Sequence, residues 1–371
     1  MQILKLATAL PKDEYSTVEL MEAFPCKLHE GIRRSVLNLG VSRRYLINQA
    51  AHSKSETLLK EDDLVDLCRK ACTDAVEKAG LSTREIGYFI AAYDVNPILS
   101  PGLSQILVRE IGFNPYVKHV NAQGIASTAF PKALELAEDH LAARPNDNVL
   151  ICVSGVSSYW FQNQVRSFED VMEIGQIGLI KDKQSHAFEL RKWIAVMQFF
   201  LFGDGVAAAV VGSCNKGLSV KKIVEVTNVS RKDYLAGYSR LSALNEPFRF
   251  GFYSHLDKEI PTLGAKYTGL ALKRLLGKNE ERIKKAAKKW VVHTGSQKIL
   301  DLLARHNEIE SDKIEESRQV LKECGNLSGA SLPFILERVV SGNKLSSRDL
   351  VLMVGYGWGF SAAACLLETI R

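Results

Sequence analysis

Two segments near the C-terminal end of the chain place a histidine and an asparagine in settings that suit chemistry. His293 ends the apolar run 290–292 and is followed by Thr294 and Gly295. Asn326 lies in a loop of small and polar residues, CGNLSGAS, where backbone and amide groups can approach a ligand closely. An imidazole and a carboxamide can together donate two hydrogen bonds to a thioester oxygen as negative charge develops on it. The alternative is a core histidine and a turn asparagine without a chemical role.

The flanking patterns indicate which elements position these two residues. The run 290–292 suits a buried strand that delivers His293 into a turn. Beyond Lys298, helical spacing is kept by the apolar residues Ile299, Leu300, Leu302 and Leu303. His293 is therefore expected between a strand and an amphipathic helix, and the Asn326 loop precedes the apolar run 332–336.

Composition sets the class of protein. With 371 residues, 46% of them apolar, the chain can bury a large core and is expected to fold as one or two α/β units. The net charge of +6 is modest, fits an anionic small-molecule carrier and does not indicate nucleic acid. The seven cysteines are expected to be reduced thiols in a cytoplasmic protein. Cys68 and Cys72 are four residues apart on a predicted helix but lack partners, so no metal site is expected.

The N-terminus lacks the layout of a signal peptide. The run 193–212, WIAVMQFFLFGDGVAAAVVG, has the length of a membrane span, but Asp204 between two glycines interrupts it. A charge at that depth is costly in lipid. We therefore expect two buried segments joined by a tight turn in a soluble protein without membrane association.

Helical and strand-like patterns alternate along the chain. Strands are predicted at 88–92, 149–154, 205–211 and 350–354, and helices at 62–80, 128–143 and 270–276. This alternation is typical of helices layered on mostly parallel sheets. A boundary near 213–217 divides the chain into halves 1–214 and 215–371, without a visible sequence repeat. The segment 158–191 is polar, charged and irregular in pattern, which predicts an insertion or a mobile cap.

A series of motifs in a fixed order covers nearly the whole chain. They are LATALPKDEYSTVEL, GVSRRYLI, AVEKAGLSTREIGYFIAA, FLFGDGVAAAVVG, WVVHTGSQKILDLL, CGNLSGASLPFIL and GYGWGF. Together they resemble the thiolase superfamily, in particular ketoacyl synthase III and the type III (chalcone synthase-like) polyketide synthases. The resemblance implies a five-layered αβαβα sandwich of two similar halves and a homodimer. It also implies a pantetheine tunnel to a buried Cys-His-Asn site, with coenzyme A thioesters as substrates and no other cofactor.

The cysteine of that catalytic set is missing. The segment KALELAEDHLAARPNDNVLICVSG aligns without gaps to the family helix that follows the nucleophile, and counting back along it places Ser127 at the cysteine position. A rival alignment is anchored on Gln123 and Gly124 and places Ile125 there. Neither alignment restores a thiol, because Cys152 and Cys324 are out of register.

A serine in place of the cysteine changes the expected chemistry. A thiolate at a helix N-terminus attacks a thioester at neutral pH, whereas a serine hydroxyl requires a general base. His293 could be that base, oriented by Asn326, in a Ser-His pair that resembles a triad. The oxygen ester so formed favours acyl transfer to an alcohol, an amine or water over carbon–carbon bond formation. The alternative is that Ser127 only caps the helix 128–143.

The resemblance assigns further site residues. Phe202 matches an aromatic residue that gates the substrate cavity, and the partner aromatic falls near Tyr253. Arg34 matches a basic position that contacts coenzyme A phosphates, and Gly357 lies in a glycine-rich loop near the active site. The alternatives are a core phenylalanine at position 202 and a solvated basic face around Arg34.

Three functions are compatible with these residues. The first is an acyltransferase or condensing enzyme of secondary metabolism or specialised lipid synthesis, loaded at Ser127 from acyl-CoA or an acyl carrier protein, with a decarboxylase-only variant. The second is a non-catalytic subunit that pairs with a cysteine-bearing homologue, although the intact His293 and Asn326 argue against it. The third, an unrelated serine hydrolase, is disfavoured because the sequence has no G-x-S-x-G motif.

Overall fold

The computed structural model describes residues 1–47, 63–98, 100–214, 216–241, 252–342 and 344–370. A nine-stranded mixed sheet runs through the body of the protein. In spatial order its strands are β11 (Ala287–Val292), β12 (Leu350–Tyr356), β13 (Ala362–Thr369), β8 (Leu218–Val226), β1 (Gln2–Ala9), β7 (Gly205–Gly212), β6 (Asn148–Gly155), β4 (Ile86–Tyr93) and β5 (Lys118–Gln123).

The sheet repeats one pairing pattern. In the first half, β1 is antiparallel to β7, β7 is antiparallel to β6, and β6 is parallel to β4. In the second half, β8 is antiparallel to β13, β13 is antiparallel to β12, and β12 is parallel to β11. The halves meet where β1 pairs with β8 at only two positions, Gln2 with Ser219 and Ile3 with Leu218. The fold thus consists of two similar halves, as expected.

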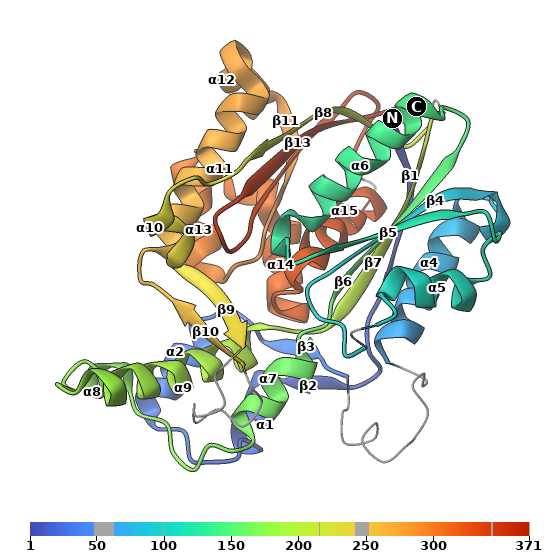
Figure 1. The fold of residues 1–371 in the computed structure, drawn as a ribbon. Coiled ribbons are helices and arrows are strands. Elements are labelled where there is room, and N and C mark those ends of the chain that lie inside the picture. Colours follow the sequence, from blue (N-terminus) through green and yellow to red (C-terminus); the bar gives the residue numbers. More distant parts are fainter. Residues whose placement is uncertain (48–62, 99, 215, 242–251, 343, 371) are drawn as a thin grey trace.

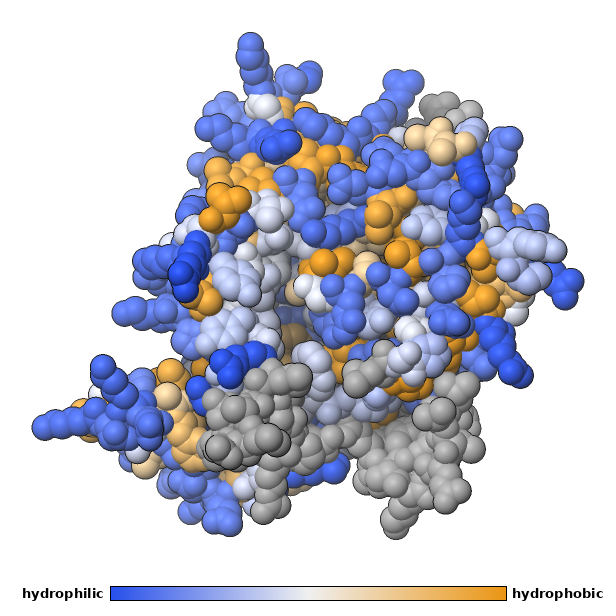
Figure 2. Space-filling view, in the orientation of Figure 1, coloured by the Kyte–Doolittle hydropathy of each residue, from blue (hydrophilic) through white to orange (hydrophobic). Residues whose placement is uncertain are grey.

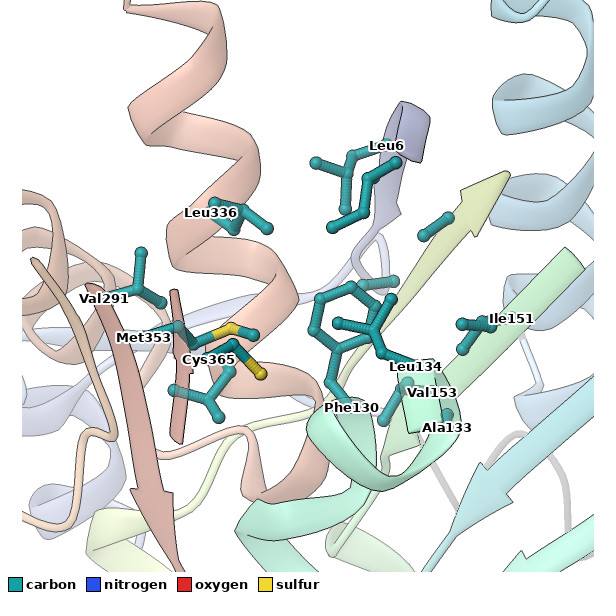
Figure 3. Close-up of a cluster of buried hydrophobic side chains, with 14 of the residues drawn as sticks. Leu6, Phe130, Ala133, Leu134, Ile151, Val153, Val291, Leu336, Met353 and Cys365 are labelled. Atoms are coloured by element: carbon teal, nitrogen blue, oxygen red, sulfur yellow. The ribbon is translucent and has the colours of Figure 1, made fainter. Parts of the chain in front are cut away.

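Strand alternation sorts the apolar side chains into layers. In β6, Val149, Ile151 and Val153 face a central cluster, whereas Leu150 and Cys152 face an outer one. The central cluster holds the buried faces of α6 (Ala129–Ala143) and α15 (Ser331–Ser341), which lie between the two half-sheets (Figure 3). The outer layers are α4 (Leu64–Lys78) and α5 (Leu103–Ile111) on one side, and α11 (Ile260–Leu276) and α13 (Gln297–His306) on the other (Figure 1). This is the predicted five-layered αβαβα sandwich.

Most of the remaining elements form a lobe beside the sandwich, which we call the cap (Figure 1). It contains β2 (Glu14–Ser16), α1 (Thr17–Glu22), α2 (Glu30–Leu37), β3 (Arg43–Tyr45), α7 (Ser158–Val165), α8 (Ile174–Ile177), α9 (Lys183–Leu201), β9 (Gly237–Leu241) and β10 (Phe252–Leu256). The segment 158–191, predicted to be an insertion or a mobile cap, lies in this lobe and contains α7, α8 and the start of α9. Asp182 caps α9 by accepting a hydrogen bond from Ser185 N, and the apolar face of α9 packs against Phe24.

Three further α-helices complete the body: α10 (Arg231–Leu235), α12 (Glu280–Ala286) and α14 (Glu315–Cys324). The predicted strands are confirmed as β4, β6, β7 and β12, and the predicted helices as α4, α6 and the last turns of α11. A strand over 290–292 and a helix after Lys298 are confirmed as β11 and α13.

The run 193–212 forms the end of α9 and strand β7, joined at Asp204. The carboxylate of Asp204 is completely buried and accepts hydrogen bonds from Ile47 N (2.8 Å), Ser157 N (2.8 Å) and Ser158 N (3.0 Å). Asp204 therefore fixes the start of α7 and the chain after β3 against the body. Within the described residues, every helix is too short or too polar to cross a lipid bilayer.

Candidate active site

Ser127 lies where the chain turns from β5 into the central helix α6. It belongs to a single 3-10 turn, Ala126–Thr128, that leads directly into α6, and only 4% of its surface is exposed. Ala126 adopts a φ of +43°, a left-handed conformation that is rare for a residue with a side chain. The side chain of Ile125, the rival candidate, packs instead at the edge of the central apolar cluster.

His293 approaches Ser127 from the other half of the molecule. It directly follows β11, its backbone N–H donates to Val354 O, and its Nε2 lies 3.0 Å from Ser127 Oγ. Burial lowers the pKa of His293 to about 3, so the imidazole is neutral at physiological pH. In the tautomer with the proton on Nδ1, Nε2 accepts the Ser127 hydroxyl. Nδ1 has no hydrogen-bond partner among the described residues.

The buried neutral histidine gives a testable pH dependence of stability. Between pH 6.5 and about 3 the unfolded chain binds a proton at position 293 that the native protein does not. The stabilising contribution is complete above pH 6.5 and is lost as the pH falls, by about 1.4 kcal/mol per pH unit. Urea unfolding of the wild type and of His293→Gln should therefore diverge on acidification, with the wild type losing stability faster. Parallel pH profiles for the two proteins would show that His293 is not buried as described.

Asn326 occupies the position in the second half that corresponds to the Ser127 turn in the first. A 3-10 turn, Ser328–Ala330, follows it and leads into α15, and Ser328 has a φ of +48°. The Asn326 backbone is held by Leu201 O, which accepts from Asn326 N at 2.9 Å. Its Oδ1 accepts from Ser328 N at 2.8 Å. The Nδ2 amide is then the group that remains to donate to a ligand.

A buried pair of hydroxyls joins the His293 and Asn326 segments. Thr294 Oγ1 donates to Ser331 Oγ at 3.0 Å, and Ser331 Oγ also accepts from Leu327 N at 3.0 Å. Thr294 and Ser331 are completely buried. Both residues stand inside the quoted motifs, but the sequence did not single them out. A local sequence pattern does not reveal a hydrogen bond between residues so far apart along the chain.

Glycines allow the segments around Ser127 and Asn326 to approach closely. At Gly329 a Cβ atom would lie 3.0 Å from Ala126 O, so the turns that carry Ser127 and Asn326 are in direct contact. At Gly357, between β12 and β13, a Cβ would lie 2.9 Å from Ala126 Cβ and 3.5 Å from Ser127 N. Gly357 therefore packs directly against the Ser127 turn.

Gly357→Ala should displace the Ser127 turn and slow any reaction at Ser127 by roughly tenfold to a hundredfold, since a shift of about 1 Å has effects of that size. Gly175→Ala is the matched control, because Gly175 has no atom within 4 Å of an added Cβ. The measurement is the rate of acyl-adduct formation by intact-protein mass spectrometry. Equal rates for the two variants would contradict the close packing.

Phe202 lies beside Asn326. The two residues form an isolated parallel β-bridge, and Gly203 N donates to Asn326 O at 3.2 Å. The Phe202 ring is partly exposed and stacks on Phe161 of α7 at a centroid distance of 5.1 Å. Phe202 thus connects the Asn326 turn to the cap.

Tyr253 and Arg34 belong to the cap. Tyr253 in β10 is buried in the apolar cluster of the cap, with Arg191 3.8 Å from its ring centroid. Arg34 is exposed on α2. Arg44 is completely buried and donates to Thr17 Oγ1 at 2.6 Å, so it does not belong to a solvated basic face.

The structure brings Ser127, His293, Asn326, Phe202 and Gly357 together, and no described contact joins Tyr253 or Arg34 to them.

The seven cysteines are free thiols. Cys68 and Cys72 on α4 meet Cys152 of β6, and burial raises the pKa of Cys68 and of Cys72. Burial also raises the pKa of Cys324, to about 11. The described residues contain no group of histidine, cysteine, aspartate and glutamate side chains arranged to hold a metal ion.

Comparisons with known proteins support the fold, and one of them matches the part of the chain that contains His293 and Asn326. Residues 280–369 match the family model of the 3-oxoacyl-[acyl-carrier-protein] synthase III C-terminal domain. The chain is 23% identical to a 3,5-dihydroxyphenylacetyl-CoA synthase of Amycolatopsis orientalis, over 98% of this chain and 92% of the relative. It is 24% identical to the phloroglucinol synthase of Pseudomonas fluorescens, over 91% and 88% of the two chains.

A solved structure is similar over the full length. The 1,3,6,8-tetrahydroxynaphthalene synthase of Streptomyces coelicolor, a bacterial type III polyketide synthase, superimposes with a TM-score of 0.80 at 20% identity, covering 100% of both chains. The repeated pairing pattern, the C-terminal family match and the similarity to these synthases agree with one another. The chain therefore has the thiolase fold of these synthases, and its residues 280–369 match the ketoacyl synthase III C-terminal family.

Proposed function

We propose that the protein is an acyltransferase that takes an acyl group from a coenzyme A or carrier-protein thioester onto Ser127. The observation that supports this most strongly is the buried contact of 3.0 Å between Ser127 Oγ and His293 Nε2. A serine hydroxyl beside a neutral imidazole is an activated nucleophile. Carbon–carbon condensation is a further possibility within the same proposal, although an acyl-serine ester is a weaker electrophile than a thioester.

In the proposed reaction, Ser127 Oγ attacks the thioester carbon while its proton passes to His293 Nε2. The carbonyl oxygen becomes an oxyanion, to which the Nδ2 amide of Asn326 donates a hydrogen bond. The carbon–sulfur bond then breaks, and the leaving thiolate takes the proton from His293. An alcohol, amine or water acceptor attacks the acyl-serine in the same way, with His293 again accepting the proton.

The replacement of the usual thiol by serine favours a second candidate. His293 and Asn326 could stabilise the enolate formed when a malonyl thioester loses carbon dioxide, without an acyl-enzyme. In that case the protein would decarboxylate, or would support a cysteine-bearing partner. We also propose a dimer, because β5 pairs only with β4 among the described strands and leaves an exposed sheet edge next to the Ser127 turn. This edge would suit a second copy of the chain or such a homologue.

Intact-protein mass spectrometry after incubation with a panel of acyl- and malonyl-thioesters, on both coenzyme A and carrier protein, tests the proposal. We expect a mass increment equal to the acyl group on the wild type and none on Ser127→Ala. No adduct with any donor would overturn the acyl-serine mechanism. Release of carbon dioxide from malonyl thioesters by both proteins would then support decarboxylation.

A further inference from the structure

The two turns that carry the catalytic residues share an unfavourable backbone conformation. Ala126 stands directly before Ser127 with a φ of +43°, and Ser328 stands two residues after Asn326 with a φ of +48°. Residues with side chains adopt this left-handed region rarely, and they stay there only where the surroundings hold them. Contacts with the rest of the protein must therefore keep both turns in this conformation and fix the position of one turn relative to the other.

One carboxylate contacts both turns. Asp94, the residue after β4, accepts a hydrogen bond from Ala126 N at 3.0 Å through Oδ1. Its Oδ2 accepts from the hydroxyl of Ser328. Ser328 N in turn donates to Asn326 Oδ1 at 2.8 Å. A continuous set of hydrogen bonds thus runs from the residue beside Ser127 to the carboxamide of Asn326.

We propose that Asp94 is the positioning residue of the site: it holds Ser127 Oγ against His293 Nε2 and sets the orientation of the Asn326 amide. Burial raises the pKa of Asp94, while its hydrogen bonds to Ser328 and Ala126 act to lower it. Desolvation of a carboxylate is costly, and here its hydrogen bonds end at the two strained turns rather than at a cation. Sequence reasoning missed Asp94 because its partners are about 30 and 230 residues away, as the positions of Ala126 and Ser328 show.

The proposal distinguishes Asp94→Ala from Asp94→Asn. Alanine removes both acceptors and leaves the Ala126 N–H without its partner, so the turn can relax and Ser127 can move away from His293. Asparagine has the same shape: its Oδ1 accepts from Ala126 N, and its amide donates to Ser328 Oγ, which can act as an acceptor. Positioning through hydrogen bonds should therefore survive in Asp94→Asn and fail in Asp94→Ala.

The primary experiment measures the rate of acyl-adduct formation at Ser127, which rests on the proposed function. We expect Asp94→Ala to be slower by roughly a hundredfold and Asp94→Asn by less than about fivefold, since misplacement by 1 Å has effects of the larger size. Ser328→Ala should be slower than the wild type, and its effect should not add fully to that of Asp94→Ala. An Asp94→Ala rate near that of the wild type would overturn the proposal. So would an Asp94→Asn rate as low as that of Asp94→Ala.

A second measurement separates this proposal from the proposed function. In the Ser127→Cys background, the pH profile of iodoacetamide alkylation at position 127 reports the placement of the side chain beside His293 without any acyl donor. Addition of Asp94→Ala should shift this profile to higher pH, and addition of Asp94→Asn should not. An unshifted profile in both would overturn the positioning role. Should Asp94→Ala fail to fold by circular dichroism, Ser328→Ala in the same background carries the test, with the same shift expected.

Discussion

Ser127→Cys should acylate faster than the wild type, by at least an order of magnitude at neutral pH, and should acquire condensing activity. A thiol beside His293 Nε2, in the turn that leads into α6, is placed to form a thiolate, which is a far better nucleophile than a hydroxyl. The resulting thioester is also a better electrophile toward a malonyl-derived enolate. The first measurement is the time course of adduct formation, in samples quenched at set times and analysed by intact-protein mass spectrometry. The second is the detection of chain-extended products from an acyl and a malonyl thioester.

The control for this prediction is the same assay on Ser127→Ala, which retains every native cysteine. Cys152 and Cys324 are buried and should not react in either protein. A faster-acylating Ser127→Cys without extended products would show that the thioester forms but does not react with the malonyl thioester. If Ser127→Cys is no faster than the wild type, position 127 is not the nucleophile position.

His293→Ala should slow acylation of Ser127 by about 10²- to 10⁴-fold, the usual contribution of a general base. The imidazole is the only described hydrogen-bond partner of the Ser127 hydroxyl, so its removal leaves the hydroxyl without a proton acceptor. The measurement is the single-turnover rate at saturating thioester, with folding checked by circular dichroism.

The pH dependence gives this prediction its control. In Ser127→Cys the thiol can ionise without a general base. In the double variant Ser127→Cys, His293→Ala the acylation rate should therefore recover as the pH rises above the pKa of a free cysteine thiol, about 8.5. His293→Ala alone should not recover in this range. A single variant as fast as the wild type would exclude His293 as the base.

Much of this site could be predicted from the sequence, because its main residues stand in motifs with local patterns. His293 follows a short buried strand, and an ungapped helix of the right type places Ser127 at the start of α6. The structure then joins the two at 3.0 Å, which favours Ser127 over Ile125. The resemblance also singled out Phe202 and Gly357, which lie beside the turns that carry Asn326 and Ser127; their roles in the site stay predictions.

The parts that were missed depend on contacts between distant segments. Asp94 and Ser331 make their hydrogen bonds with partners that local periodicity cannot reveal. The helices of the segment 158–191 were missed because charged residues on the surface of the cap obscure the helical pattern, and packing against Phe24 and its neighbours stabilises them. Tyr253 lies on a two-stranded sheet whose register the sequence does not fix.

The placement of α6 and α15 in the central layer has an electrostatic consequence. α6 begins in the turn that carries Ser127 and α15 in the turn that follows Asn326, and these turns touch at Gly329 and Ala126. A helix N-terminus carries the equivalent of roughly half a positive elementary charge, so two of them meeting at one place supply about one unit. His293 is neutral and Asn326 is uncharged at physiological pH, so this positive charge comes from the backbone amides alone. Backbone amides do not titrate. The attraction of these two turns for negative charge therefore has a source that neither acid nor the loss of a side-chain proton can remove.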